Sequence, residues 1–325
     1  MERHHIVPQF LLRHFANEDG QLRAFDRTNF DSLHMTSVTK ACREAGYYRI
    51  ESEDLEEWAR DGHDPELVEK TLSSIETDAA DIIANIIAGK LPHTDADRLH
   101  LALFVALQMT RGWQFREEIN QIGTLRMREV LGSRREELAV KARTSLRRRG
   151  LPAKPEDVEK FLERALGSNG PKLVMNDPVR VQVSLGHALH TVRPLLMQHH
   201  LRVLRFDKPS LVISDAPVGN WAPGEDRAVG VGNAALVFLP LSRQVALAYG
   251  AKVRTADTVA GPTRAAQINF LVVDGAARWA YEHPADRIVE SLDIPADRPQ
   301  WVTEFVAGID ESGGFRRELW QHVRQ

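Results

Sequence analysis

The chain has 325 residues, of which 43% are hydrophobic and 27% charged, and its formal net charge at pH 7 is −3. Such a composition is typical of a globular protein with a sizeable core, and the near-neutral charge excludes a general attraction to nucleic acid. The single cysteine, Cys42, excludes both an intrachain disulfide and a zinc site built on cysteines.

The first predicted element is a short helix that follows Pro8. In HHIVPQFLLRHFA the proline suits the first turn of a helix, and the apolar residues after it form one face. Residues 21–27, QLRAFDR, alternate in polarity as a strand does. A longer helix is predicted from Pro65 to Gly89, because its apolar residues recur at helical spacing and glycine ends such runs.

Helices are predicted for the next hundred residues as well. Thr94 and Asp97 have the spacing of a capping box, and they precede a long apolar helix that Gly112 and Gly123 are expected to bend or break. Two charged helices follow at 134–150 and 154–167, and the second begins with a proline. A further helix starts near Asp177, and Pro194 is expected to end or kink it.

The pattern changes near residue 200, where short β-rich runs replace the helical spacing. These runs lie between residues 200 and 250 and are separated by turn residues, which predicts antiparallel hairpins. Residues 263–284 then return to a helical pattern. The predicted fold class is therefore α+β, mainly helical with a small antiparallel sheet from the 200–250 region.

No internal repeat and no flexible linker is visible in the sequence. We therefore expect a single intertwined domain over residues 1–325. Its predicted parts are a helical part at about 1–200, a sheet and late helix at about 201–284, and a C-terminal tail at 285–325.

The sequence also indicates where the protein works. No apolar run approaches the ~20 residues of a membrane-spanning helix, and the segment FLL is too short for the core of a signal peptide. The lone cysteine suits a reducing compartment. We expect a cytoplasmic protein without a membrane partner, and the arginine-rich, alanine-rich composition indicates a bacterial source with a high GC content.

Two adjacent histidines, His4 and His5, are the first candidates for chemistry. In an extended segment neighbouring side chains point to opposite sides, so at most one of them faces a given site. An imidazole there suits a general base or a metal ligand. The segment HHIVP is similar to the core of HNH nucleases, but QFLLRHF follows directly and leaves no room for their hairpin. The alternative is a terminal segment without a function.

The motifs, taken in order, resemble the bacterial domain-of-unknown-function family 4238. They are the start HHIVPQFLLRHFA, the strand QLRAFDR, Gln108-Met-Thr-Arg111, Ser214-Asp215-Ala216-Pro217, the Pro-Leu-Ser turn at 240–242 and the Ile-Asn pair at 268–269. The resemblance spans roughly residues 4–281. Members of the family more often have asparagine at the position of Ala216. The resemblance implies positions of interest and no reaction.

Gln108 and Arg111 interrupt an apolar helix and share one of its faces, because they are three residues apart. An arginine is suited to bidentate binding of a phosphate or a carboxylate. The alternative is that Arg111 pairs with a core carboxylate such as Glu76 or Asp215, or marks the point where the helix leaves the core.

Asp215 ends an apolar strand just before a loop rich in glycine and proline, as catalytic carboxylates often do. The alternative is that Ser214 and Asp215 cap a turn. Glu76 lies in an apolar helical stretch and is a candidate for the same cleft, although a solvated face is the competing interpretation. For Asn269 the alternative to a ligand role is a hydrogen bond to buried backbone.

Two basic clusters at 126–129 and 143–150 offer a further interpretation. Their cations are suited to phosphate contacts, but no aromatic residues interleave them as in single-strand binding platforms. The competing interpretation is a solvated helix face, or cations that complement the C-terminal end of a helix dipole.

These candidates lead to the hypothesis of a nuclease-type hydrolase that cleaves a phosphodiester or a nucleotide. His4 or His5 would act as general base or metal ligand, and Asp215 would orient the imidazole or hold a divalent metal ion. The predicted substrate-binding residues are Gln108, Arg111, Ser214 and Asn269. The candidate metal ligands are His5, Glu76 and Asp215.

The alternative is a non-catalytic binding or regulatory module, such as a component of a defence or toxin system. In that case the polar motifs form a buried network that specifies the fold. The geometry separates the two hypotheses, because a fully paired network favours structure, whereas an unpaired imidazole and guanidinium favour function.

Overall fold

The computed structural model describes residues 3–57, 60–92, 94–167, 170–224, 229–251, 256–295, 301–309 and 315–323. The chain separates into two compact units. Unit 1 consists of Met1–Arg116, Asp177–Val302 and Gln321–Gln325, and unit 2 consists of Glu117–Asn176 and Thr303–Trp320. The predicted α+β class is confirmed. The prediction of one intertwined domain is left open by this division.

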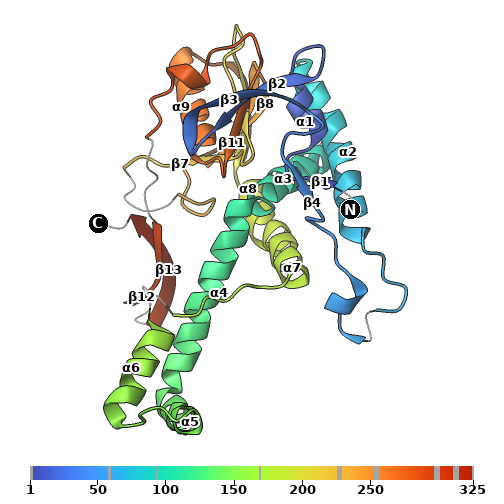
Figure 1. Ribbon diagram of the computed structural model, residues 1–325. Coiled ribbons are helices and arrows are strands. Elements are labelled where there is room, and N and C mark those ends of the chain that lie inside the picture. The colour runs from blue at the N-terminus through green and yellow to red at the C-terminus, as the bar shows by residue number, and fades with distance from the viewer. Residues whose placement is uncertain are drawn as a thin grey trace. The chain divides into compact units, whose positions relative to one another are not determined.

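Unit 1 contains helices from both halves of the sequence (Figure 1). They are α1 (Gln9–Arg13), η1 (Ser52–Asp54), α2 (Leu67–Ile87), α3 (Asp95–Thr110), α7 (Asp177–His187), η3 (Ala188–Val192), α8 (Arg193–Gln198), α9 (Pro262–Asp274) and η4 (Val289–Ser291). The predicted capping box is confirmed, because the Thr94 hydroxyl accepts from the Asp97 N–H at 3.0 Å and the Asp97 carboxylate accepts from the Thr94 N–H at 3.2 Å. As predicted, Gly89 stands just beyond the end of α2, in the left-handed conformation at φ +94°.

The predicted kink at Pro194 is confirmed, and it takes the form of one π-helical turn, η3, between α7 and α8. A proline has no N–H to donate to the carbonyl four residues earlier, and its ring clashes with that carbonyl. A wider turn ahead of the proline relieves both problems.

Three sheets lie in unit 1. The first pairs β1 (Arg3–His5) with β4 (Arg43–Ala45). The second has the strand order β3 (Asn29–Ser37), β2 (Gln21–Asp26), β11 (Trp279–Glu282), β6 (Ile213–Ser214). The third has the order β10 (Ala256–Val259), β5 (His200–Arg205), β9 (Val245–Gly250), β8 (Leu236–Ser242), β7 (Gly219–Trp221). Within the third sheet the predicted antiparallel pairing holds for β5, β9, β8 and β7, and β10 joins β5 in parallel.

Two sequence predictions about the last third of the chain need correction. The helix predicted for 263–284 ends at Asp274, and Trp279–Glu282 forms β11 between β2 and β6. A short strand inside a sheet is buried on both faces, so its sequence does not alternate and is easily taken for helix. The region predicted as a tail contains η4 and the paired strands β12 (Trp301–Ile309) and β13 (Phe315–Val323).

The N-terminal segment is built into the core of unit 1. Leu11, Leu12 and Phe15 are completely buried and belong to the main hydrophobic cluster, which also contains most of the buried face of α3. Phe10 packs against Phe104 of α3, with 5.6 Å between the ring centroids. This packing fixes the position of His4 and His5, so the segment is not a detached terminal extension.

Unit 2 is described by its own helices. α4 (Trp113–Ser133) begins in unit 1 and continues into unit 2, where α5 (Arg135–Arg148) and α6 (Pro155–Leu166) follow it. Ala142 of α5 packs with Val158 and Leu162 of α6 in a small core of their own. Among the described residues, no helix of the chain has both the length and the apolar character needed to span a membrane.

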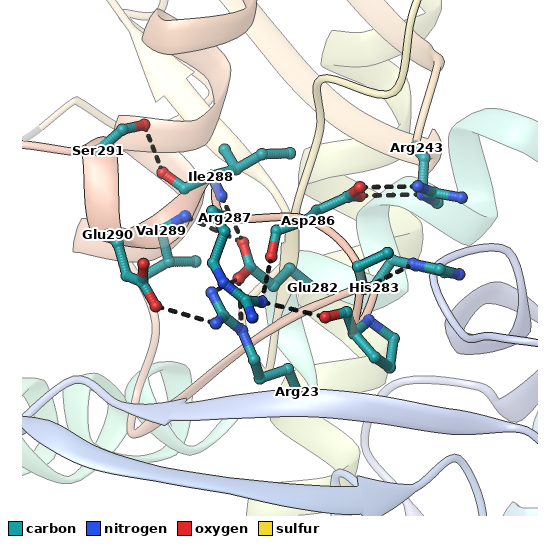
Figure 2. Close-up of polar contacts among 12 residues, drawn as sticks. Arg23, Arg243, Glu282, His283, Asp286, Arg287, Ile288, Val289, Glu290 and Ser291 are labelled. Atoms are coloured by element: carbon teal, nitrogen blue, oxygen red, sulfur yellow. Dashed lines mark hydrogen bonds and ion pairs between the residues drawn. The ribbon is translucent and has the colours of Figure 1, made fainter.

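A buried ion pair connects the second sheet of unit 1 to η4 (Figure 2). The Arg23 guanidinium donates from Nε to Glu282 at 2.8 Å and from Nη1 to Glu290 at 2.9 Å. The second oxygen of Glu282 accepts the backbone N–H groups of Ile288 and Val289 at 2.8 and 3.0 Å. Arg23 and Glu282 are almost inaccessible to solvent, so each charge depends on the other for its neutralisation.

We expect Glu282→Gln to lower the free energy of unfolding by about 3–5 kcal/mol, because it leaves the Arg23 charge buried without its main partner. Urea unfolding followed by circular dichroism measures the loss. Arg135→Gln, which removes one partner of the exposed Arg135–Glu159 pair, is the matched control and is expected to cost less than about 1 kcal/mol. Equal losses in the two variants would contradict the structural role of the Arg23–Glu282 pair.

Candidate functional site

β1 turns its two histidines to opposite sides, as the sequence predicts for an extended segment. His4 is buried, and both of its ring nitrogens have partners. Nδ1 accepts the N–H of Tyr48 at 2.8 Å, and Nε2 lies 3.1 Å from a carboxylate oxygen of Glu66. Since Nδ1 is an acceptor, Nε2 carries the hydrogen and donates it to Glu66. The ring also stacks on Tyr48, so His4 has no nitrogen available for a ligand.

His5 is different, because one of its nitrogens is available. Its imidazole has a hydrogen bond with the backbone of Thr39, and Nε2 is buried without a hydrogen-bond partner in the described part of the chain. Burial lowers the pKa of His5, the Thr39 bond raises it, and the charge of Arg43, the residue opposite in β4, lowers it further. A backbone hydrogen bond raises the pKa of a histidine when the ring donates to a carbonyl oxygen. The hydrogen on Nδ1 of His5 is therefore donated to the backbone carbonyl of Thr39. Nε2 of the neutral ring then has a free lone pair, as a general base needs.

Arg111 stands at the C-terminal end of α3, where Gly112 separates this helix from α4. Its side chain is buried, and Nη1 donates to Glu76 of α2 at 2.6 Å. Burial alone would lower the pKa of Arg111, but the charge and the hydrogen bond of Glu76 more than offset it. The sequence alternative in which Arg111 pairs with Glu76 is therefore confirmed, and the solvated face suggested for Glu76 is wrong. The Nε and Nη2 atoms of Arg111 are buried without partners among the described residues.

Arg111 lines a small cavity of about 10 Å³, the Arg111 cavity, whose walls are largely apolar and include Leu72 and Leu107. Tyr48, Thr110 and Ser184 also line it, and their hydroxyls have no hydrogen-bond partner within the described ranges. The amide of Gln108, one helical turn before Arg111, is buried and equally unpaired there. Such a cavity has room for about one water. The groups around it are those that hold a water or a single anionic oxygen.

His5, Arg111 and Asp215 are electrostatically linked. Burial, Thr39 and Arg43 have the largest effects on the pKa of His5. The charge of Glu76 then raises this pKa, and the charge of Arg111 lowers it. The pKa of Cys42 is raised chiefly by burial and then by the charge of Asp215, while Arg111 lowers it. The charge of Arg111 therefore reaches both His5 and Cys42, and that of Asp215 reaches Cys42.

Asp215 is held by backbone. Its carboxylate accepts three N–H groups of the turn that leads into β11, from Ala277 at 2.6 Å, Arg278 at 2.8 Å and Trp279 at 2.9 Å. The hydroxyl of Ser214 accepts the N–H of Ala216 at 3.2 Å. These contacts match the turn-capping alternative for this pair of residues, and a catalytic role for Asp215 stays a prediction.

The side-chain amide of Asn269 forms hydrogen bonds with buried backbone groups. Its oxygen accepts the N–H of Val212 at 3.1 Å, and its nitrogen donates to the carbonyl of Ser210 at 2.7 Å. The side chain thus connects α9 to the segment that enters β6. This is the structural alternative that the sequence left open for it.

A larger cavity of about 190 Å³ opens at Asp215. We call it the Asp215 cleft, and its lining includes Ile6, Lys40, Cys42, Arg43, Asp215 and Trp279. Lys40 and Arg43 are exposed. Ile6 follows His5 in the chain and Arg43 pairs with His5 in the β1–β4 ladder, so the cleft lies next to the segment that carries the unpaired imidazole.

The candidate metal ligands His5, Glu76 and Asp215 do not form a ligand cluster. Among the described residues no group of three or more histidine, cysteine, aspartate or glutamate side chains is placed to hold a metal ion. Metal binding at these residues stays a prediction from the sequence.

Sequence reasoning missed several residues of the site. Tyr48, Thr110 and Ser184 place hydroxyl groups on the Arg111 cavity, and Glu66 pairs with His4. The one available signal was the pair Tyr47-Tyr48 after Gly46, a glycine with φ +62° that turns the chain inward. Glu66 lies in an acidic stretch, and such sequences are typical of exposed segments.

The comparisons with known proteins give a family and no function. A family model described as "Protein of unknown function (DUF4238)" matches residues 3–286, which confirms the resemblance indicated by the sequence motifs. No curated protein and no solved structure matches the chain. The matched region includes every predicted site residue, and it ends before β12 and β13.

We expect Asp215→Asn to lower the free energy of unfolding by about 3 kcal/mol. An amide of the same shape offers one acceptor oxygen and turns N–H donors toward the N–H groups of the turn. Thermal and urea unfolding measure the effect. Asp207→Asn, at an exposed aspartate of the same unit, is the control and is expected to be nearly neutral. A neutral Asp215→Asn would show that the three backbone contacts are not important for folding.

Proposed function

The chain belongs to the DUF4238 family of proteins of unknown function, and we propose that it is a nuclease-type hydrolase that cleaves a phosphodiester or a nucleotide. In this proposal His5 is the general base and Arg111 binds the anionic group. One observation carries the proposal: the Nε2 atom of His5 and the Nε and Nη2 atoms of Arg111 are buried without partners among the described residues, and their charges act on each other.

The unpaired atoms of Arg111 suit a phosphate. Nε–H and Nη2–H lie on one edge of the guanidinium and donate in parallel, so both can converge on a single phosphate oxygen, for which the cavity has room. Glu76 occupies Nη1, so the charge of Arg111 is only partly neutralised by a carboxylate that is itself partly exposed. Donors already fixed in a buried site stabilise the charge that develops on a phosphoryl oxygen.

The unpaired nitrogen of His5 suits the activation of water. A neutral imidazole takes the proton of a water as its oxygen forms a bond to phosphorus, and the bond to the leaving oxygen breaks. The proton on His5 can then pass to the leaving oxygen. The lowered pKa of His5 keeps the ring neutral, and therefore basic, at neutral pH.

The remaining predicted residues have supporting roles in this proposal. His4 and Asp215 position β1 and the wall of the Asp215 cleft through their contacts, and Gln108 adds unpaired amide groups beside Arg111. A divalent metal ion remains part of the hypothesis, with His5, Glu76 and Asp215 as its candidates, and no step is routed through it. A cytoplasmic, bacterial setting is proposed because Cys42 is a free, buried thiol and the composition suits such a source.

A non-catalytic binding or regulatory module is the second candidate function. The observation that favours it is the complete pairing of His4 and Asn269, together with the three backbone contacts of Asp215. A protein of this kind would bind an anionic ligand at Arg111 without turning it over.

We expect His5→Gln to lower the rate of phosphodiester cleavage by about 100-fold or more, as the loss of a general base does. His4→Gln is the matched control, since it removes a buried neighbour whose nitrogens are already paired. It is expected to lower the melting temperature while the folded protein keeps its rate. Cleavage of labelled DNA, RNA, nucleotides and bis(4-nitrophenyl) phosphate, each with and without Mg²⁺ or Mn²⁺, provides the assay.

Arg111→Lys tests the anion site in the same assay. A lysine keeps the positive charge beside Glu76 but lacks the two parallel donors, so a loss of about 100-fold is expected. Arg243→Lys, in the bidentate pair with Asp286, controls for the loss of an equivalent contact elsewhere. No turnover of any substrate by the folded wild-type protein would favour the binding module, and wild-type rates in His5→Gln would remove His5 from the mechanism.

The proposed role of His5 also fixes a pH dependence. Burial places the pKa of His5 below its usual value of 6.5, so kcat/KM is expected to be constant at neutral pH and to fall as the pH drops below 6.5. The same shift weakens folding in that range, because the unfolded chain takes up the proton more readily than the folded one. Rates and unfolding midpoints measured from pH 5 to 8 check both effects. An inflection above pH 7 would contradict this assignment.

A further inference from the structure

The end of α5 in unit 2 carries an unusual concentration of positive charge. Between Glu137 and Glu156 the sequence contains no acidic residue, while it contains Lys141, Arg143, Arg147, Arg148, Arg149 and Lys154. We call these six residues the α5 cluster. All six side chains are exposed, and the structure describes every residue of this stretch.

The geometry of α5 directs these side chains outward. Ala142 is buried against α6, with Leu138 and Leu146 packed beside it, so these positions define the inner face of the helix. Lys141 and Arg148 are seven residues apart and share one side of the helix, while Arg143 and Arg147 are four apart and share another. Both sides lie away from the inner face at 100° per residue. The outer surface at this end of α5 therefore carries cations on both sides, with Val140 and Thr144 exposed between them.

The cluster differs from three other arginines of the same unit. Arg126, Arg134 and Arg135 each form an ion pair with a glutamate, whereas no ion pair to a carboxylate is seen for the α5 cluster among the described residues. A helix dipole accounts for cations in the last turn only, which here means Arg147 and Arg148. Lys141, Arg143 and Lys154 lie outside that turn and need another explanation.

We propose that the α5 cluster is a binding surface for the phosphodiester backbone of a double-stranded nucleic acid. A row of unpaired cations matches a polymer that presents closely spaced phosphates, and it gains affinity by releasing their counterions. No aromatic residue lies between Arg135 and Pro155, so the surface lacks the stacking groups that single strands require. Because the contacts are made to backbone, binding is independent of base sequence.

This inference goes beyond the proposed function, since the surface binds whether or not His5 and Arg111 cleave anything. It rests on that function in one respect only: a bound duplex would supply the phosphodiester substrate. Binding and cleavage are therefore measured separately. The binding experiment uses the full chain with His5→Gln, which removes the proposed general base.

The test compares two triple variants that remove the same charge from the same unit. Arg143→Gln/Arg147→Gln/Arg148→Gln removes unpaired cations of the cluster, and Arg126→Gln/Arg134→Gln/Arg135→Gln removes paired ones. Fluorescence anisotropy with labelled duplex DNA and duplex RNA gives Kd between about 50 and 200 mM salt. Circular dichroism verifies that each variant is folded, and Lys141→Gln/Lys154→Gln is a second cluster variant if the first unfolds.

The proposal expects the cluster variant to bind at least 10-fold more weakly than the paired-arginine variant. The slope of log K against log salt should become shallower by up to about 2.7 on DNA, at about 0.9 for each lost contact. A similar loss on duplex RNA would support the backbone as the recognised feature.

Three results would overturn the proposal. The first is no duplex binding by the full chain at about 50 mM salt. The second is an equal loss in both triple variants, which would indicate net charge and not the cluster. The third is binding to vesicles of phosphatidylserine and phosphatidylcholine that exceeds binding to the duplex. Duplex binding by the wild-type chain without any cleavage of the bound duplex or of the other phosphodiester substrates would overturn the proposed hydrolase alone.

Discussion

The site of unit 1 depends on one buried guanidinium, that of Arg111. A buried charge must be neutralised, and Glu76 neutralises it from α2 through Nη1 at 2.6 Å. The same residue marks the end of α3, where its carbonyl accepts the hydroxyl of Tyr47 at 2.8 Å. The backbone carbonyl of Tyr47 in turn accepts a hydrogen bond from the Arg116 guanidinium at 2.7 Å, and the Tyr47 ring lies under that guanidinium. The break between α3 and α4, the inward turn at Tyr47-Tyr48 and the position of α2 are thus all connected through Arg111.

The predicted site residues divide according to how completely they are paired. One group forms hydrogen bonds to Glu66 or to backbone groups with its polar atoms, and it consists of His4, Asp215 and Asn269. These contacts join elements that are far apart in the sequence. His5 and Arg111 each retain polar atoms that are buried without a partner among the described residues. The number of hydrogen bonds already made separates positioning residues from candidates for ligand binding. A side chain whose polar atoms all have partners cannot bind a ligand, whereas a buried polar atom without a partner is stabilised by one.

Local sequence signals predicted local structure well. The Thr94–Asp97 capping box, the break at Gly112 and the kink at Pro194 were all visible, because each depends on residues within one helical turn. The break predicted at Gly123 is wrong, because α4 continues through that residue. The second sheet was not, since β11 pairs with β2 across some 250 residues and carries no alternation. The histidine pair shows how far the sequence can predict the site. Alternation predicts that the two rings point to opposite sides. It does not predict their partners Glu66 and Thr39, which lie elsewhere in the chain and decide which ring keeps an unpaired nitrogen.

Unsatisfied polar groups gather at the Arg111 cavity and one helical turn away from it, at Gln108. Tyr48, Gln108, Thr110, Arg111 and Ser184 all keep buried polar atoms without a partner in the described part of the chain. Each such group costs about 1–3 kcal/mol if nothing satisfies it, and a folded domain is stable by only about 5–15 kcal/mol. A cavity of about 10 Å³ accepts one water or one anionic oxygen and nothing larger. An anionic oxygen at this place is what the proposed function requires, because a guanidinium donates to it with a full charge.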